Sequence, residues 1–296
     1  MPKRSVDAFH ASHERPALAL AAAAVFSLVL PDTAHARGLP KNLNEAQLVE
    51  YLSDGGEQAR AEACHRLGKR RSRSAVQPIG KTALEDGSAK VREQCLEALE
   101  EIGGEDGLKV ARKAALADEN DGVRVTAIEV IKRLDRDEDG GATLGKIVLD
   151  DDASVRVRRT AANVLGDKRW RSGADALART IKGDEPLDLR RESLKALVVM
   201  GDKRSYEIVH HTLLKDPSVE MRREASWVLE RHPDRSSLDP LCMALRDSDD
   251  KVVKNAIDAL MRLGNRKAAP ALREAAAGVN DRLAKKMNSV AARLER

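Results

Sequence analysis

The chain has 296 residues, of which 42% are apolar, 34% are charged and only 2% are aromatic. Its 52 basic residues nearly balance its 48 acidic ones, so the formal net charge is only +4. This composition excludes a collagen-like chain, a disulfide framework and a multi-span membrane protein, and it favours a soluble helical protein packed by aliphatic side chains. Because the basic excess is slight and aromatic side chains are scarce, we expect no nucleic-acid partner.

The first 36 residues have the pattern of a signal peptide. Three basic residues precede an apolar run over residues 17–30, and Ala34-His35-Ala36 supplies the small-x-small sequence that signal peptidases recognise. The run has 14 residues, whereas a helix that spans a bilayer needs about 20. We therefore expect cleavage after Ala36 and a periplasmic or secreted product, residues 37–296, without a membrane span. An uncleaved anchor is the less favoured alternative.

From about residue 42 onward, one pattern of apolar residues recurs every 31–34 residues. Each copy begins at an anchor residue and continues at +4, +7 or +8 and +11, which is the spacing of one helix face. The anchors are Ala59, Val91, Val123, Val157, Leu189, Met221, Val252 and Leu283. Shorter helices are expected before them, as at 75–84, 142–149, 206–214, 238–245 and 268–277. Because neither helix can bury its apolar stripe alone, the sequence predicts an all-α fold, an α-solenoid of about eight two-helix repeats.

Two charged positions recur with the same period. An Asp lies five residues before the anchor in seven copies, namely Asp54, Asp86, Asp118, Asp152, Asp184, Asp216 and Asp247. An Arg follows the anchor in six copies, namely Arg60, Arg92, Arg124, Arg158, Arg190 and Arg222. We expect the Asp to cap the second helix of each repeat, and the two series to form a ladder of hydrogen bonds between neighbouring repeats. The alternative is a row of arginines that binds a ligand.

The segments 86–103, 118–134 and 216–229, joined by turns such as Leu165-Gly166, resemble short HEAT-like repeats of the phycobilin-lyase type. The resemblance covers nearly the whole chain after Ala36. It implies the solenoid fold, and it leaves the function open, since such repeats serve many unrelated binding tasks and a few enzymes.

The residues that carry the chemistry of the related enzymes do not recur here. Deoxyhypusine hydroxylase resembles this fold and holds two iron ions with repeated His-Glu dyads, whereas the histidine sequences here are His65-Arg66, His210-His211 and His232-Pro233. No local motif matches the chromophore chemistry of the phycobilin lyases. HEAT-like DNA glycosylases need a cationic, aromatic groove and act inside the cell, whereas this chain has the pattern of an export signal. We therefore expect a protein without enzymatic activity or a cofactor.

The three cysteines are too few for a disulfide framework. Cys95 occupies a +4 core position, so a buried thiol is the expectation. Cys64 and Cys95 lie in adjacent copies and could pair after export. Stacked helices about 9 Å apart are beyond the usual reach of a disulfide, however. The oxidation state of the pair stays open.

An acidic turn over residues 135–140 is the sharpest local motif. Asp135, Asp137 and Asp139 alternate before a glycine, as in the first half of an EF-hand calcium loop. The twelfth position of such a loop is Lys146 instead of a bidentate Glu, so any calcium site here would be weak. The favoured interpretation is an acidic turn that ends one helix and begins another.

The inner surface of a solenoid of this kind is lined by the second helices. Positions +2 and +6 face away from the core, and they predict a groove that is acidic near its beginning and basic from the fourth repeat onward. The candidate partner-binding residues are Glu93, Glu97, Arg159, Arg191, Arg223, Trp227, Lys254 and Lys285. This pattern favours an exported, non-enzymatic scaffold that binds protein partners in its groove. The alternatives are a calcium-tuned or polymer-binding envelope module and, least favoured, a lyase-type enzyme.

Overall fold

The computed structural model describes residues 39–136, 139–201 and 203–296, and the predicted signal peptide lies outside them. The described residues form sixteen α-helices and no strand. The first helices of the repeats are α1 (Glu45–Asp54), α3 (Val76–Glu85), α5 (Glu105–Ala117), α7 (Asp139–Val148), α9 (Ala174–Lys182), α11 (Lys203–Lys215), α13 (Leu238–Ala244) and α15 (Ala269–Ala275). The second helices are α2 (Glu57–Lys69), α4 (Ala89–Ile102), α6 (Asp121–Leu134), α8 (Val155–Lys168), α10 (Leu187–Met200), α12 (Val219–Arg231), α14 (Asp250–Leu263) and α16 (Asp281–Leu294). These eight pairs confirm the predicted solenoid.

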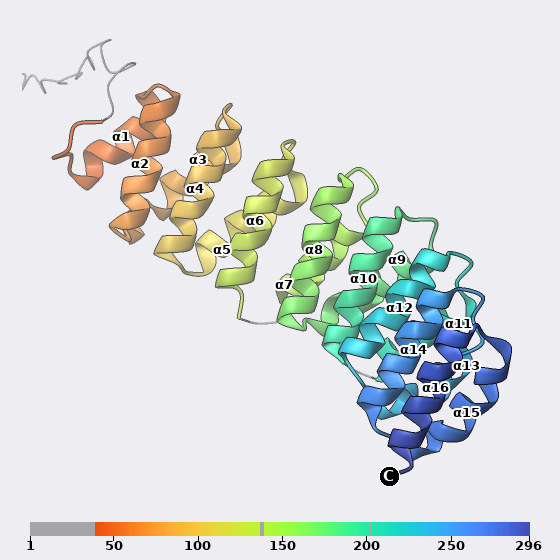
Figure 1. The fold of residues 1–296 in the computed structure, drawn as a ribbon. Helices are drawn as coiled ribbons and strands as arrows, with labels where there is room; N and C mark the ends of the chain where they lie inside the picture. Colours follow the sequence, from red (N-terminus) through yellow and green to blue (C-terminus); the bar gives the residue numbers. More distant parts are fainter. Residues whose placement is uncertain (1–38, 137–138, 202) are drawn as a thin grey trace, which may run out of the picture.

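The repeats stack in sequence order into an elongated, two-layered body, with α1 at one end and α16 at the other (Figure 1). One layer contains the first helices and the other contains the second helices. At every junction the contact between successive second helices is more extensive than the contact between successive first helices. The second helices thus pack side by side along one face of the stack, the face that the sequence predicts to be the inner one.

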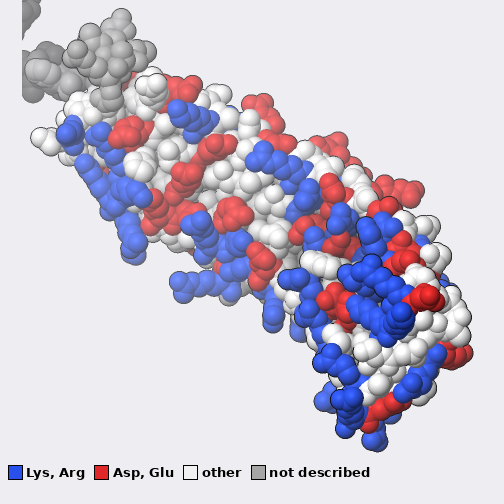
Figure 2. Space-filling model, in the orientation of Figure 1, with Lys and Arg blue, Asp and Glu red and all other residues white. Residues whose placement is uncertain are grey.

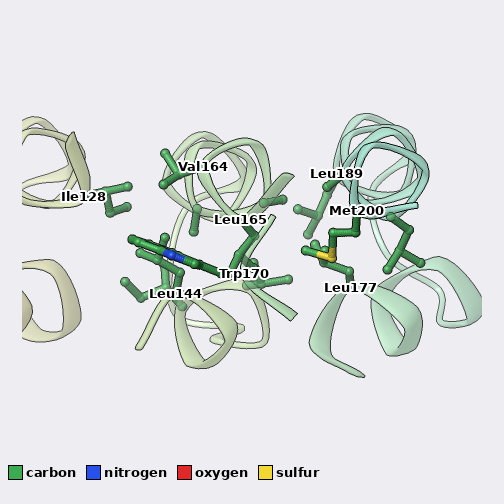
Figure 3. Packing of buried hydrophobic residues seen from close by; sticks show 14 of the residues in the cluster. Ile128, Leu144, Val164, Leu165, Trp170, Leu177, Leu189 and Met200 are labelled. Carbon is green, nitrogen blue, oxygen red and sulfur yellow. The ribbon is translucent and has the colours of Figure 1, made fainter. Parts of the chain in front are cut away.

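One continuous apolar core runs between the two layers, from Leu39 to Ala291. All eight anchor residues predicted from the sequence are buried in it. Figure 3 shows a section of this core, in which side chains from both helix layers meet in a single seam. Because each repeat shares its core with one or two neighbours, stacking supplies apolar contacts that a single pair of helices lacks.

Trp170 occupies an unusual position in this core. It lies in the turn between α8 and α9, it is 4% exposed, and its ring packs between Leu144 and the end of α8 (Figure 3). The glycines of α7 make room for it: a Cβ atom at Gly140 would lie 2.9 Å from the indole ring, and one at Gly141 would lie 2.8 Å from the Trp170 Cβ. Gly140, which the sequence suggested as part of a calcium loop, therefore serves the packing of the core.

The predicted ladder of arginines and carboxylates is present. Arg92 donates two hydrogen bonds to the carboxylate of Asp118 in the next repeat, both of 2.8 Å, and a third to the backbone oxygen of Asp86 at 2.7 Å. The six pairs are Arg60–Asp86, Arg92–Asp118, Arg124–Asp150, Arg158–Glu185, Arg190–Asp216 and Arg222–Asp247. In two repeats the acceptor is thus Asp150 or Glu185 in place of the predicted Asp152 or Asp184. These arginines hold neighbouring repeats in register.

The predicted role of the recurrent Asp as a helix cap was wrong by two residues. Asn120 caps α6, since its side chain accepts hydrogen bonds from the backbone N–H groups of Gly122 and Val123. Asp118 instead accepts the N–H of Asn120 at 2.9 Å while it binds Arg92. The same Asp-before-cap arrangement recurs at Asp216 and Ser218. The Asp therefore ties the turn before the helix to the ladder.

A disulfide bond joins Cys64 of α2 to Cys95 of α4, and both residues are fully buried. The expectation of a buried thiol at Cys95 was therefore wrong. A uniform helix spacing of about 9 Å would keep the two cysteines out of reach of each other, but their Cα atoms lie only 4.9 Å apart. Small residues permit this approach, since a Cβ atom at Gly68 of α2 would lie 2.7 Å from the Cα atom of Ala98 of α4.

His210 makes the stability of the sixth and seventh repeats dependent on pH. Its Nε2 atom lies 2.8 Å from the hydroxyl of buried Ser237. Desolvation lowers the pKa of His210, and the charges of Asp234 and Glu207, which raise this pKa, offset the effect only in part. As the pH falls, His210 is therefore protonated in the unfolded chain before it is protonated in the folded one. The contribution of this group to the free energy of unfolding is complete above about pH 6.5 and is lost as the pH falls toward the lowered pKa of the folded state.

We expect the His210→Gln variant to lose less stability than the parent between pH 7 and pH 5. The difference should be at most about 1.4 kcal/mol for each pH unit, the limit for one proton. Thermal melts of both proteins across this range measure it, with exposed His211→Gln as the matched control. Some acid sensitivity should remain in His210→Gln, because burial also lowers the pKa of His232. Parallel curves for the parent and His210→Gln would contradict the assignment.

Candidate partner-binding groove

The inner face of the second helices contains two hollows. The larger, of about 660 Å³, lies across α10, α12 and α14, and the smaller, of about 630 Å³, lies across α6, α8 and α10. The larger hollow is lined by Arg191, Lys195, Glu220, Arg223, Glu224, Trp227, Lys251, Lys254 and Asn255. The smaller is lined by Val125, Glu129, Val155, Arg156, Arg159, Thr160, Asn163 and Glu192. The structure thus brings four of the predicted partner-binding residues together in the larger hollow: Arg191, Arg223, Trp227 and Lys254.

Trp227 is the exposed aromatic residue of the groove. Its residue surface is 38% exposed, although the residues on either side of it in α12, Ser226 and Val228, are buried. Two cations flank its ring, with the Lys195 ammonium 5.8 Å and the Arg231 guanidinium 4.9 Å from the ring centroid. These cation–π contacts hold the indole in place. A large, positioned aromatic side chain that remains open to solvent is a typical anchor for a partner.

A buried carboxylate fixes the cations on the α10 side of the hollow. Glu224 is 6% exposed and accepts a hydrogen bond of 2.8 Å from Arg191, and the Lys195 ammonium lies 3.5 Å from its other oxygen. Arg191 belongs to the basic row predicted from the sequence, and much of its charge is compensated inside the fold. Because the carboxylate comes from the next repeat, this pair also joins α10 to α12.

Arg223 has a similar partner in the repeat that follows it. It donates hydrogen bonds to both oxygens of Asp249, at 2.9 and 2.5 Å, and these bonds lower the pKa of Asp249 to about 2. Asp249 also caps α14 through the N–H groups of Lys251 and Val252. Arg223 is therefore a structural residue of the α12–α14 junction as well as a groove residue.

The lysines of α14 and α16 differ from these arginines. Lys251, Lys254 and Lys285 are exposed, and among the residues that the structure describes no carboxylate lies within ion-pair distance of their ammonium groups. Sequence reasoning selected Lys254 and Lys285 but missed Lys251. The spacing of three residues between Lys251 and Lys254 was the available signal, since residues three apart share a helix face.

The remaining predicted groove residues lie outside the larger hollow. Arg159 lines the smaller hollow, with its guanidinium 3.7 Å from Asp188. Glu93 and Glu97 lie on α4, four repeats before Trp227, where Glu97 accepts a hydrogen bond from Gln94. Figure 2 shows acidic and basic side chains intermingled along the face in view, with basic ones both beside the first repeats and gathered over the last repeats. The predicted residues thus form a long inner face with one compact cluster around Trp227.

In the acidic turn, the carboxylate of Asp135 is engaged within the fold. Asp135 is 2% exposed, and its carboxylate lies 2.5 Å from the guanidinium of Arg112. Asp139 begins α7, and Asp137 lies outside the described residues. Within residues 39–136, 139–201 and 203–296 no group of three or more His, Cys, Asp or Glu side chains is arranged to hold a metal ion. The turn places Asp135 in an ion pair that a cation would have to displace.

A family profile described as HEAT repeats matches residues 45–138 and 208–287, more than half of the chain. The chain belongs to the HEAT-repeat family. No curated protein sequence gives a significant match. This HEAT-repeat chain is similar to the solved structure of the Escherichia coli protein YibA, with 23% identity, a TM-score of 0.50 and coverage of 86% of this chain and 93% of that one.

Two other solved structures are more distant. The complex of CpcE and CpcF of phycocyanin lyase from a Nostoc species is 17% identical, with a TM-score of 0.41 over 88% of this chain and 97% of that one. Human deoxyhypusine hydroxylase is 18% identical, with a TM-score of 0.38 over 84% of this chain and 95% of that one. At these identities the similarities concern the HEAT-repeat fold alone. None of the described helices has the length and apolarity of a membrane-spanning helix.

Proposed function

We propose that this HEAT-repeat protein is an exported, non-enzymatic scaffold that binds a protein partner along the inner face of its second helices. The observation that carries the proposal is the exposed Trp227, which lines the larger of the two hollows and has two cations close to its ring. Aromatic residues in hollows of this kind contribute much of the free energy of protein association.

Two observations support export. Residues 1–36 have the signal-peptide pattern, and Cys64 and Cys95 form a buried disulfide. Structural disulfides form and persist in oxidising compartments such as the periplasm or the cell exterior, and they are rare in the cytosol. Both features therefore favour the same location. The mature chain recovered from its native cell should begin after Ala36 and should contain no free thiol at either cysteine.

The inner face favours a protein partner over a simple anionic polymer. A polymer that binds through charge alone needs a row of free cations. Arg191 and Arg223 of the predicted row are instead engaged by Glu224 and Asp249. The hollow thus combines an apolar anchor with charges of both signs, the composition of a protein–protein interface.

Capture of the native partner from the envelope tests this function. The parent and the Trp227→Ala variant would each be crosslinked in the native envelope and purified, and the associated protein identified and quantified. We expect Trp227→Ala to lose about tenfold or more of the captured partner, because truncation of a central aromatic anchor costs about 2 kcal/mol or more. Met243→Ala is the matched control, since Met243 is 59% exposed on α13, a first helix. Equal losses of the captured partner from both variants, or no loss from either, would refute binding of the partner in the groove.

A further inference from the structure

The cations around the larger hollow divide into two classes. On α10 and α12, Arg191, Lys195 and Arg223 are compensated by the carboxylates Glu224 and Asp249. On α14, Lys251 and Lys254 line the same hollow, are exposed, and have no carboxylate of the described residues within ion-pair distance. The uncompensated positive charge of the hollow therefore lies on one wall, that of α14.

The exposed apolar surface lies on the neighbouring wall. Trp227 projects from α12, and its ring is steadied by Lys195 and Arg231. Five of the nine residues that line the hollow are basic and two are acidic, so the hollow has an excess of positive charge. A ligand that fills it must place an apolar group against α12 and negative charge against α14.

We propose that the occupant of this hollow is an extended acidic segment of the partner protein, with an apolar side chain on Trp227 and carboxylates on Lys251 and Lys254. This inference rests on the proposed function and specifies the class of partner. Adjacent packed helices lie about 9 Å apart, and an extended chain advances about 3.3 Å per residue. The apolar residue and the acidic pair are therefore separated by about three residues.

Synthetic peptides test this proposal directly. The probe is a short, Trp-free peptide with one Phe and, three residues away, two adjacent acidic residues. One control peptide replaces the acids by their amides, and another places the Phe next to the acids. The protein itself reports binding, because its two tryptophans differ: Trp227 is 38% exposed, whereas Trp170 is 4% exposed. We expect a saturable change in tryptophan emission with the probe peptide and binding about tenfold weaker with each control peptide.

Charge reversal on the protein provides the second arm. The double variant Lys251→Glu and Lys254→Glu should bind the probe peptide about tenfold more weakly, or worse, and should melt like the parent, because neither lysine is paired within the fold. The matched control is the double variant Lys113→Glu and Lys215→Glu. These lysines are also exposed but lie on the first helices α5 and α11, and the control changes the net charge by the same amount. Its affinity should remain within about twofold of that of the parent.

The outcomes separate this inference from the proposed function. Three results would each overturn the proposal that an acidic segment occupies the hollow. They are equal affinity for the acidic and amide peptides, undiminished binding by the α14 double variant, and tighter binding of a polyuronate than of the probe peptide. If the native partner were still lost from Trp227→Ala in that case, the groove function would stand. Retention of the native partner by Trp227→Ala would overturn the groove function itself.

Discussion

Replacement of Trp170 by Ala should destabilise the protein by about 3–5 kcal/mol, the range for removal of a large buried aromatic side chain. Trp170 is 4% exposed and fills a space that Gly140 and Gly141 of α7 leave beside it. Because these glycines have no side chains that could close the gap, a cavity remains between the fourth and fifth repeats. In a stack that is stable only through contacts between neighbours, this cavity weakens the junction between the two halves.

Denaturant unfolding and hydrogen exchange of the parent and Trp170→Ala measure this effect. We expect the variant to unfold in two resolved steps, with amides of α7 and α9 exposed earlier than in the parent. Trp227→Ala serves as the control, because Trp227 is 38% exposed and its removal leaves no buried cavity. A single transition with unchanged stability in Trp170→Ala would show that the core does not depend on this ring.

Reduction of the Cys64–Cys95 disulfide should lower the stability of the first repeats by about 2–4 kcal/mol. The bond joins residues 31 apart in the sequence and links α2 to α4 at the end of the stack, where the first repeat has a neighbour on one side only. In the chain-entropy account, the bond limits the unfolded ensemble of this terminal segment. Reduction of the folded protein should be slow, because both sulfur atoms are buried.

The measurement compares unfolding of the Cys242→Ser variant with and without reductant. This variant removes the free cysteine, so that no third thiol exchanges with the bond. We expect early exchange of α1 to α4 amides after reduction, while the repeats from α9 to α16 keep the protection of the oxidised form. Identical unfolding curves would mean that the bond does not support the terminal repeats.

The periodic part of the fold was predictable from the sequence because the burial of the second helices follows one spacing throughout. The anchors from Val91 to Val252 are all fully buried, as the pattern predicted. The arginine ladder was predictable for the same reason, since it repeats with the anchors. Its acceptors shift to Asp150 and Glu185 only in the fourth and fifth repeats, around the irregular junction that contains Trp170.

The features that sequence reasoning missed depend on contacts between repeats that a single repeat does not encode. The Cys64–Cys95 bond forms because Gly68 and Ala98 let two helices approach more closely than the average spacing. Likewise, the repeat that contains Arg191 does not show its pairing, because its partner Glu224 lies 33 residues later and is buried. A pattern of exposed positions indicates which residues face the groove, but their net charge depends on the neighbouring repeat.

The most direct test of the proposed groove asks which face of the stack touches the partner. A photocrosslinking amino acid would replace Glu220, which lines the larger hollow, or Met243, which is exposed on the first helix α13. Each variant would be irradiated in the native envelope, and its crosslinked products would be identified by mass spectrometry. We predict one discrete protein product from position 220, diminished by the additional change Trp227→Ala, and none from position 243. A product from position 243 alone, or the same product from both positions, would contradict a partner held on the inner face.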